Sequence, residues 1–118
     1  MLTQLEVKKS STNTGVRVFS FIGELDETNV DSTFPNIIGD IGDFNKTRTL
    51  FNFEKLTYLN SKSIGYIADT AQRTEDGSGK FAICCLSVEV RNTLDLVGIT
   101  NIIPIYETEE IALIELSK

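Results

Sequence analysis

Residues 48–73, RTLFNFEKLTYLNSKSIGYIADTAQR, decide the fold because they join two different patterns of apolar residues. The first part, RTLFNFEKL, is a short and almost uninterrupted apolar run, which is typical of a strand buried on both faces of a parallel sheet. In the second part, Ile64, Ile67, Ala68 and Ala71 recur at helical spacing. The stretch therefore predicts a central strand followed by an amphipathic helix. The side chains expected to face solvent are Lys62, Ser63, Tyr66, Asp69 and Arg73.

Two strands and a helix are predicted before this stretch. Residues 5–11 and 16–23 alternate in the manner of strands on either side of the turn sequence TNTG, and Gly23 is expected to end the second strand. Apolar residues over 29–43 recur at helical spacing. Pro35 lies inside that segment and predicts a kink or a late start of the helix, because proline removes a backbone donor.

The remaining elements are predicted after residue 73. A loop is expected over 74–80, a buried strand over 80–87, a helix over 87–99, a strand over 101–106 and a closing helix over 107–116. The residues that set these boundaries or faces are Ser87 as a helix cap, Val97 as an inward side chain, Gly98 as a helix end and Pro104 as the sign of a sheet edge.

Strands and helices alternate from the middle of the chain onward, which favours a mostly parallel sheet covered by helices. The predicted fold class is α/β, with a mixed, mostly parallel sheet of about five strands and about four helices. The length of 118 residues fits one domain, expected to cover residues 1–118.

Composition excludes several classes of function. The net charge of −6 repels nucleic acid and anionic lipid, so neither is an expected partner. No apolar stretch is long enough for a membrane span, and the N-terminal sequence MLTQLEVKKSS lacks the pattern of a signal peptide, so a cytoplasmic location is expected.

The side chains needed for common catalytic and metal sites are missing. The chain has no histidine, which excludes Ser-His-Asp triads, and its two cysteines, Cys84 and Cys85, are expected to be buried strand residues. GSGK at 77–80 lacks the other residues of a phosphate-binding loop. Neither a metal ion nor a cofactor is expected, and the chain is not expected to be an enzyme.

The polar sequence NSKS at 60–63 has two interpretations. Asn60, Ser61 and Ser63 are residues that cap helices, so they can simply end a strand and start a helix. Alternatively, one hydroxyl is a regulated site, because the free amides and the dipole of a helix N-terminus favour an added phosphate.

Three stretches together resemble the STAS domain of bacterial anti-sigma factor antagonists. FIGELDETN is similar to that family's strand end, LFNFEKLTYLNSKSIGYI to its central strand, turn and next helix, and ICCLSVEVRNTLDLVGITNIIPIYETEEIAL to its C-terminal part. The resemblance implies that the chain binds an anti-sigma factor that is also a serine kinase, which holds ATP and magnesium. It also implies release on phosphorylation and a phosphatase that restores binding.

The resemblance also assigns roles to residues. It implies that Ser61 is the phosphoacceptor, and we treat Ser63, expected to turn outward, as a second candidate. Partner contacts are expected within residues 23–26 and 58–66. The residues expected to contact or support the partner are Gly23, Glu24, Asp26, Asn60, Lys62, Ile64 and Tyr66.

This sequence departs from the family pattern around the acceptor. Asn60 replaces an aspartate, Lys62 replaces a serine or threonine, Ser63 replaces a glycine and Val88 replaces a proline. These changes leave open a second function, a STAS scaffold that is not phosphorylated and works in a larger signalling or transport assembly. A binder of nucleotides or other small ligands is a third hypothesis. The sequence does not fix whether the chain forms oligomers.

Overall fold

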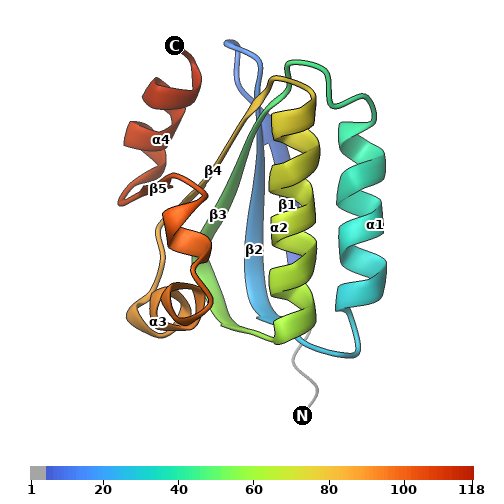
Figure 1. Ribbon diagram of the computed structural model, residues 1–118, viewed down its shortest axis with the longest axis vertical. Coiled ribbons are helices and arrows are strands. Elements are labelled where there is room, and N and C mark those ends of the chain that lie inside the picture. The colour runs from blue at the N-terminus through green and yellow to red at the C-terminus, as the bar shows by residue number, and fades with distance from the viewer. Residues whose placement is uncertain (1–4) are drawn as a thin grey trace.

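The computed structural model describes residues 5–118, which form one five-stranded sheet with strand order β1-β2-β3-β4-β5 (Figure 1). β1 pairs with β2 in antiparallel fashion, and the other neighbours are parallel. The mixed, mostly parallel sheet predicted from the sequence is therefore confirmed. The strands are β1 (Glu6–Ser11), β2 (Val16–Leu25), β3 (Arg48–Leu59), β4 (Lys80–Cys84) and β5 (Ile105–Tyr106).

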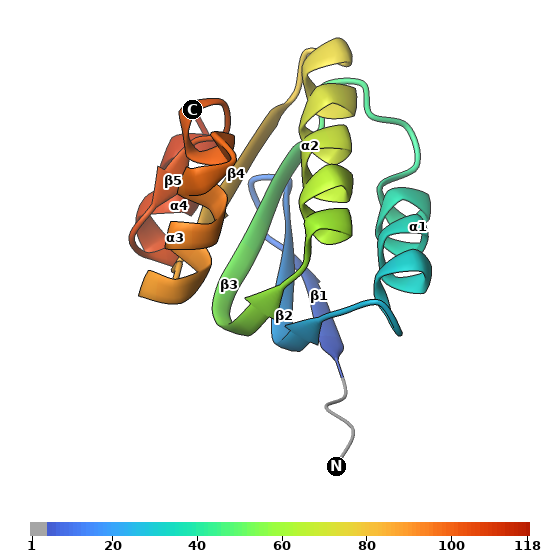
Figure 2. The ribbon, with the colours of Figure 1, turned by 60° about the horizontal axis from the view of Figure 1, so that its bottom comes forward.

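Helices cover both faces of the sheet (Figure 2). They are α1 (Val30–Ile41), α2 (Ser61–Asp76), α3 (Val88–Leu96) and α4 (Glu109–Leu116), and a 3-10 turn, η1 (Ile99–Asn101), follows α3. Buried side chains of the first three helices pack on one face with the phenylalanines of the strands. Ala112 and Leu116 of α4 pack on the other face against Val16, Val18 and Leu50.

β3 occupies the centre of the sheet, as its apolar run predicts. Leu50, Phe51 and Phe53 are fully buried. The ring of Phe51 lies 5.0 Å from that of Phe21 on β2 and 4.8 Å from that of Phe81 on β4, measured between ring centroids. Burial of large aromatic side chains supplies a dominant part of core stability, so these contacts fix β3 between its neighbours.

The prediction that Gly23 ends its strand is wrong. β2 continues to Leu25 and pairs with an extended β3, whose register places Glu24 opposite Tyr58. Two irregularities interrupt this register, one on each side of Gly23, and Gly23 has a φ of 115°. A glycine at a bulge adopts such a φ without steric cost, so the strand bends there and continues.

Of the two alternatives predicted for α1, a kink or a late start, the late start does not occur, because the helix begins at Val30 and runs through Pro35 to Ile41. Pro35 removes the helical donor to the carbonyl of Asp31, and both residues are exposed to solvent. The buried residues of this helix are Val30, Phe34, Ile37 and Ile41.

The C-terminal half differs from the prediction in several places, and β4 ends at Cys84 instead of residue 87. α2 extends to Asp76, so residues 74–76 of the expected loop are helical. The expected strand over 101–106 is reduced to Ile105–Tyr106, because η1 occupies its start and Pro104 cannot donate a ladder bond. Val97 was expected to point inward but is 57% exposed, because α3 ends at Leu96 and Gly98 then reverses the chain with a φ of 78°.

The sequence GSGK at 77–80 allows a close contact with the backbone of residues 44–47. A side chain at Gly77 would place its Cβ 2.2 Å from the carbonyl oxygen of Phe44, and one at Gly79 would place it 2.3 Å from that of Thr47. The two glycines therefore let the turn between α2 and β4 lie directly against the loop between α1 and β3.

Candidate functional site

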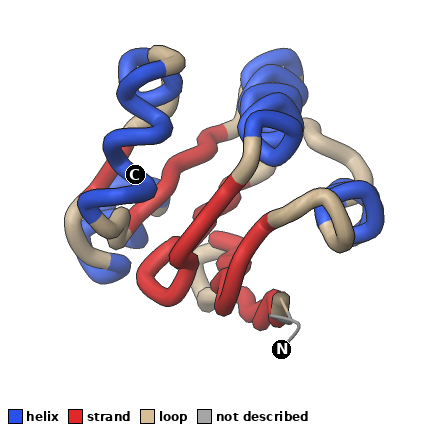
Figure 3. The backbone as a smooth tube through the Cα atoms, turned by 90° about the horizontal axis from the view of Figure 1, so that it is seen from below, coloured by secondary structure: helices blue, strands red, loops and turns tan. Residues whose placement is uncertain are grey.

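The residues predicted to form the site come together where α1 and α2 begin, at the carboxyl ends of β2 and β3 (Figure 3). The parallel pairing of the two strands brings their ends side by side. Leu25 of β2 lies opposite Leu59 of β3, one residue before Asn60. The segments 23–26 and 58–66 are therefore neighbours in space, although about 30 residues separate them in the chain.

The start of α2 is fixed by a reciprocal pair of hydrogen bonds between Asn60 and Ser63. The N–H of Ser63 donates to Asn60 Oδ1 at 2.9 Å, and the N–H of Asn60 donates to Ser63 Oγ at 3.0 Å. This capping box satisfies two backbone donors that a helix start otherwise leaves free.

The capping box corrects the expectation that Ser63 turns outward. Ser63 is fully buried, and its hydroxyl is committed to Asn60. A kinase active site has no access to a hydroxyl in this position, so Ser63 is not retained as a candidate for phosphorylation. Its role in the structure is to begin the helix.

Ser61 has the opposite environment. It is the first residue of α2 and is exposed to solvent, and the capping box does not use its hydroxyl. The backbone N–H groups of the first helical turn have no intrahelical acceptor, and the helix dipole adds partial positive charge there. The position accommodates an anion on the Ser61 oxygen without disturbing the cap.

Lys62 forms an ion pair with Asp31, a residue that was not predicted from the sequence to belong to the site. Its Nζ lies 2.8 Å from Oδ2 of Asp31 on α1, and the hydroxyl of Tyr66 donates to Oδ1 of the same carboxylate at 2.9 Å. These hydrogen bonds, with Lys62 first and Tyr66 second, lower the pKa of Asp31, and Asp31 in turn raises the pKa of Lys62 and of Tyr66. We call Asp31, Lys62 and Tyr66 the α1–α2 clamp.

Tyr66 and Ile64 are only partly exposed and contribute to packing. The Tyr66 ring stacks on Phe34, with the centroids 5.0 Å apart and the planes 5° from parallel. Ile64 packs against the main core cluster. Both residues thus support the face next to Ser61, and only part of each side chain is available to a partner.

The loop after β2 is shaped by Asp26 and Asn29. Asp26 Oδ1 accepts from the N–H and the hydroxyl of Thr28 at 2.9 and 2.6 Å, and these bonds lower the pKa of Asp26. The side chain of Asn29 donates to the carbonyl of Glu24 at 2.9 Å and accepts from the N–H of Asp26. Asp26 is therefore a turn former, and Asn29 is a further positioning residue that the sequence did not reveal.

Tyr58 adds an exposed aromatic side chain to this edge. It lies opposite Glu24 in the strand register and is 49% exposed. Exposed tyrosines are enriched at protein interfaces because they combine apolar area with a polar group. The residue falls inside the segment 58–66 that was expected to contact a partner.

Comparisons with known proteins agree with this architecture. Residues 8–112 match the family model of the STAS domain. This match covers most of the chain. The chain belongs to the STAS domain family.

One relative of this STAS domain is an antagonist of an anti-sigma factor. The chain is 28% identical over 102 residues to the anti-sigma F factor antagonist of Paenibacillus polymyxa, which covers 86% of this chain and 87% of that protein. A crystal structure of an anti-sigma factor antagonist from Mycobacterium paratuberculosis has a TM-score of 0.86 and 20% identity, covering 98% and 96% of the two chains.

A second solved relative exists in two chemical states. Bacillus SpoIIAA in its phosphorylated form has a TM-score of 0.72 and 22% identity, covering 93% of this chain and 98% of that chain. The antagonist SpoIIAA has also been solved unphosphorylated, with a TM-score of 0.77 and 21% identity over 93% and 95% of the chains. These structures show the shared STAS fold.

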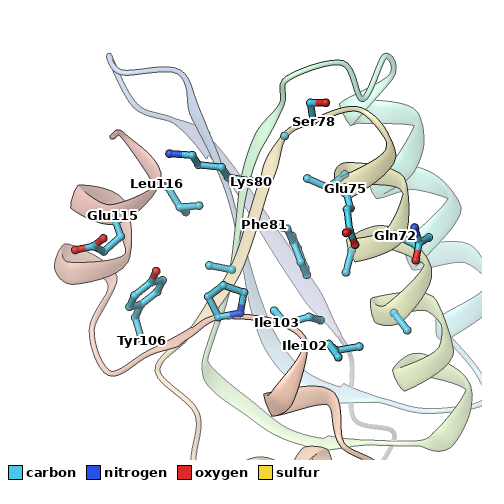
Figure 4. A pocket seen from close by; sticks show the side chains of 16 residues that line it. Gln72, Glu75, Ser78, Lys80, Phe81, Ile102, Ile103, Tyr106, Glu115 and Leu116 are labelled. Atoms are coloured by element: carbon cyan, nitrogen blue, oxygen red, sulfur yellow. The ribbon is translucent and has the colours of Figure 1, made fainter.

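A groove of 650 Å³ lies in another part of the STAS domain (Figure 4). It runs between the C-terminal half of α2 and the segment from Ile102 to Tyr106, with Phe81 at its floor and Glu75 and Glu115 on opposite sides. None of the residues predicted for the site lines it.

Among residues 5–118, no helix has the length and apolar character required to cross a membrane.

Proposed function

We propose that this STAS domain is an anti-sigma factor antagonist whose binding is switched by phosphorylation of Ser61. The observation that carries the proposal is the contrast between two serines of one turn, because Ser61 is exposed while Ser63 is buried in the helix cap. The antagonist relative in Paenibacillus polymyxa and the phosphorylated form of Bacillus SpoIIAA support the same conclusion.

A phosphate on Ser61 is expected to leave the fold intact. The capping box joins Asn60 to Ser63, so no structural hydrogen bond is lost when the Ser61 hydroxyl is modified. A negative group at a helix N-terminus is stabilising by about 0.3 to 1 kcal/mol. The effect of the modification therefore falls on binding and not on folding.

The same phosphate is expected to abolish docking. A unit charge within about 4 Å of a like charge on a partner costs roughly 4 kcal/mol at an effective dielectric near 20. That free energy corresponds to about three decades of affinity. A dianion at the centre of a protein interface is thus sufficient to dissociate the complex.

We assign the docking face to the two segments that meet at the carboxyl ends of β2 and β3. Tyr58 and the clamp residue Tyr66 present aromatic groups, and the ion pair of Lys62 with Asp31 presents one charge of each sign. Asp26 and Asn60 hold the backbone around them. The remaining residues proposed to contact or support the partner are Gly23, Glu24 and Ile64.

In this proposal the chain is a substrate of phosphoryl transfer and not its catalyst. The anti-sigma factor is a serine kinase that holds ATP and magnesium, and a cognate phosphatase removes the phosphate. The whole chain, residues 1–118, acts as a single STAS domain in the cytoplasm, and its net charge of −6 disfavours direct contact with nucleic acid.

The test uses the tagged chain, the Ser61→Ala variant and the Ser61→Asp variant on extract of the native cell. The parent is expected to retain an anti-sigma factor and to release it on addition of ATP, with phosphate found on the Ser61 peptide by mass spectrometry. Ser61→Ala should bind but not release, and Ser61→Asp should bind about tenfold more weakly or worse. Release of the partner from Ser61→Ala by ATP would contradict the proposal.

A STAS scaffold without a switch is the second candidate, and the clamp favours it. Lys62 replaces the second hydroxyl of the family turn and is paired with Asp31, so the surface next to Ser61 differs from that of the family. If the partner stays bound in ATP and the Ser61 peptide carries no phosphate, the scaffold is the correct function.

A further inference from the structure

Cys84 and Cys85 present two thiols on the same face of the sheet, which adjacent strand residues do not normally do. β4 ends at Cys84, and Cys85 has a φ of 65°. This left-handed conformation turns the second side chain back, so that Sγ of Cys85 lies 3.4 Å from Sγ of Cys84. Such a φ is strained for a residue other than glycine.

The two thiols differ in exposure but lie in the same cluster of packed side chains. Cys84 is fully buried in the cluster formed with α4, and Cys85 is partly exposed and packs against the same cluster. A reagent therefore meets Cys85 first. Burial, followed by the hydrogen bond with Cys85, raises the pKa of the Cys84 thiol.

A disulfide between these residues is disfavoured by geometry. Adjacent Cα atoms are about 3.8 Å apart across a trans peptide, whereas disulfides usually join Cα atoms about 4.4 to 6.8 Å apart. The sulfur atoms would also have to approach from 3.4 Å to the bond length of about 2 Å. One atom inserted between the sulfurs removes this strain, because two bonds of about 2.3 Å meeting near a right angle span roughly 3.3 Å.

A bridging metal ion is not supported by the surroundings. Structural zinc takes about four protein ligands, and within residues 5–118 no three or more His, Cys, Asp or Glu side chains form a group that could hold a metal ion. An atom that bridges the two sulfurs here must form only two bonds to the protein. Any further substituent of that atom must come with the ligand. Trivalent arsenic bearing one organic group meets this requirement.

We propose that Cys84 and Cys85 form a dithiol site for monosubstituted trivalent arsenicals. This site goes beyond the proposed antagonist function and does not depend on it. In the reaction each thiol loses its proton, two arsenic–sulfur bonds form, and the oxygen of the arsenic oxide leaves with both protons as water. Nothing is oxidised or reduced. The raised pKa of Cys84 does not oppose the reaction, since reactants and products are both neutral.

The experiment uses phenylarsine oxide and the folded, fully reduced chain. Native mass spectrometry should show one phenylarsenic group per single chain, removed by a dithiol but not by an equal concentration of monothiol. Cys85→Gly is the matched control, because glycine accepts a φ of 65° and the variant should keep its fold. It should bind phenylarsine oxide about tenfold more weakly or worse, and Cys84→Ala should do the same.

Three results would overturn the proposal. The first is that the folded chain takes up no phenylarsine oxide while the chain unfolded in guanidinium does. The second is that Cys85→Gly binds as tightly as the parent. The third is an adduct that joins two chains, which would assign the sulfurs to different molecules. Circular dichroism of each variant establishes that it is folded before binding is measured.

Discussion

The carboxylate of Asp31 on α1 lies 2.8 Å from the ammonium group of Lys62 on α2, and the same carboxylate accepts the hydroxyl of Tyr66. This contact ties the starts of two helices that are 31 residues apart in the chain. It also neutralises the cation that stands beside Ser61. The charge that a partner meets at this face is therefore set by Asp31 as much as by Lys62.

The first prediction concerns the pKa of Asp31. Lys62→Met and Tyr66→Phe each remove a hydrogen bond to the carboxylate, so each should raise the Asp31 pKa toward its ordinary value, Lys62→Met by more. Carbon-detected NMR titration of the carboxyl group measures it. Tyr66→Phe keeps the ring that stacks on Phe34, and Arg73→Met, which removes the partner of Asp69, is a control that should leave Asp31 unchanged.

The sign of the pH effect follows from the lowered pKa. The folded state binds a proton at Asp31 less readily than the unfolded state, so the contribution to stability is present above the ordinary pKa of aspartate and is lost as pH falls through the folded value. Lys62→Met should reduce the part of the stability loss at low pH that arises from protonation of Asp31. An unchanged Asp31 pKa in Lys62→Met would show that the pair does not form in solution.

The second prediction separates the two serines of the α2 turn by stability. Ser63→Ala removes one half of the capping box and should lower the free energy of unfolding by about 1 kcal/mol. Ser61→Ala removes an exposed hydroxyl and should change it by less than about 0.5 kcal/mol. Urea denaturation measures both. Equal destabilisation by the two substitutions would contradict the assigned roles.

The third prediction uses two glycines as a matched pair. Gly79→Ala would place a Cβ 2.3 Å from the carbonyl oxygen of Thr47, so the backbone must move, and a loss of about 2 kcal/mol or more is expected. Gly65 lies in α2 with nothing within 4 Å of its Cβ position. Gly65→Ala should therefore raise the free energy of unfolding by about 0.5 to 1 kcal/mol. A destabilised Gly65→Ala would be evidence of a contact at that position.

The fourth prediction addresses a buried hydroxyl. Oγ1 of Thr49 on β3 is buried and has no hydrogen-bond partner among the described residues. Valine has nearly the same shape and no hydroxyl, so Thr49→Val should raise the free energy of unfolding by about 1 kcal/mol. Thermal and urea unfolding measure the change. A loss of stability would indicate that the hydroxyl has a partner in solution.

Sequence reasoning succeeded where apolar patterns are strong and failed where polar residues are buried. The apolar run of β3 was sufficient to predict a central strand. The face of α2 was predicted in part: Ile67 is buried and Ile64, Ala68 and Ala71 pack against the core, but the other buried residues are Ser63, Thr70 and Thr74. The hydroxyls of Thr70 and Thr74 donate to carbonyls one turn earlier in the helix, at Tyr66 and Thr70. Threonine satisfied in this way can be buried like an apolar residue, and no sequence pattern signals it.

The candidate site was predicted in part for a similar reason. Ser61 and its neighbours are consecutive in the sequence, so a local pattern and a family resemblance were enough to select them. Asp31 acts on Lys62 and Tyr66, which only the packing of α1 beside α2 brings close to it. Such pairings depend on the tertiary structure, and the sequence alone contains no spacing that reveals them.

The strand order β1-β2-β3-β4-β5 has a consequence for biosynthesis. Each strand pairs with the one made immediately before it, so no segment leaving the ribosome must wait for a partner encoded further downstream. Chains are synthesised at roughly 5 to 20 residues per second, which is slow compared with the formation of hairpins and helices. The sheet can therefore grow outward from its N-terminal edge while translation continues, because the elements around Ser61 all precede β5 in the chain.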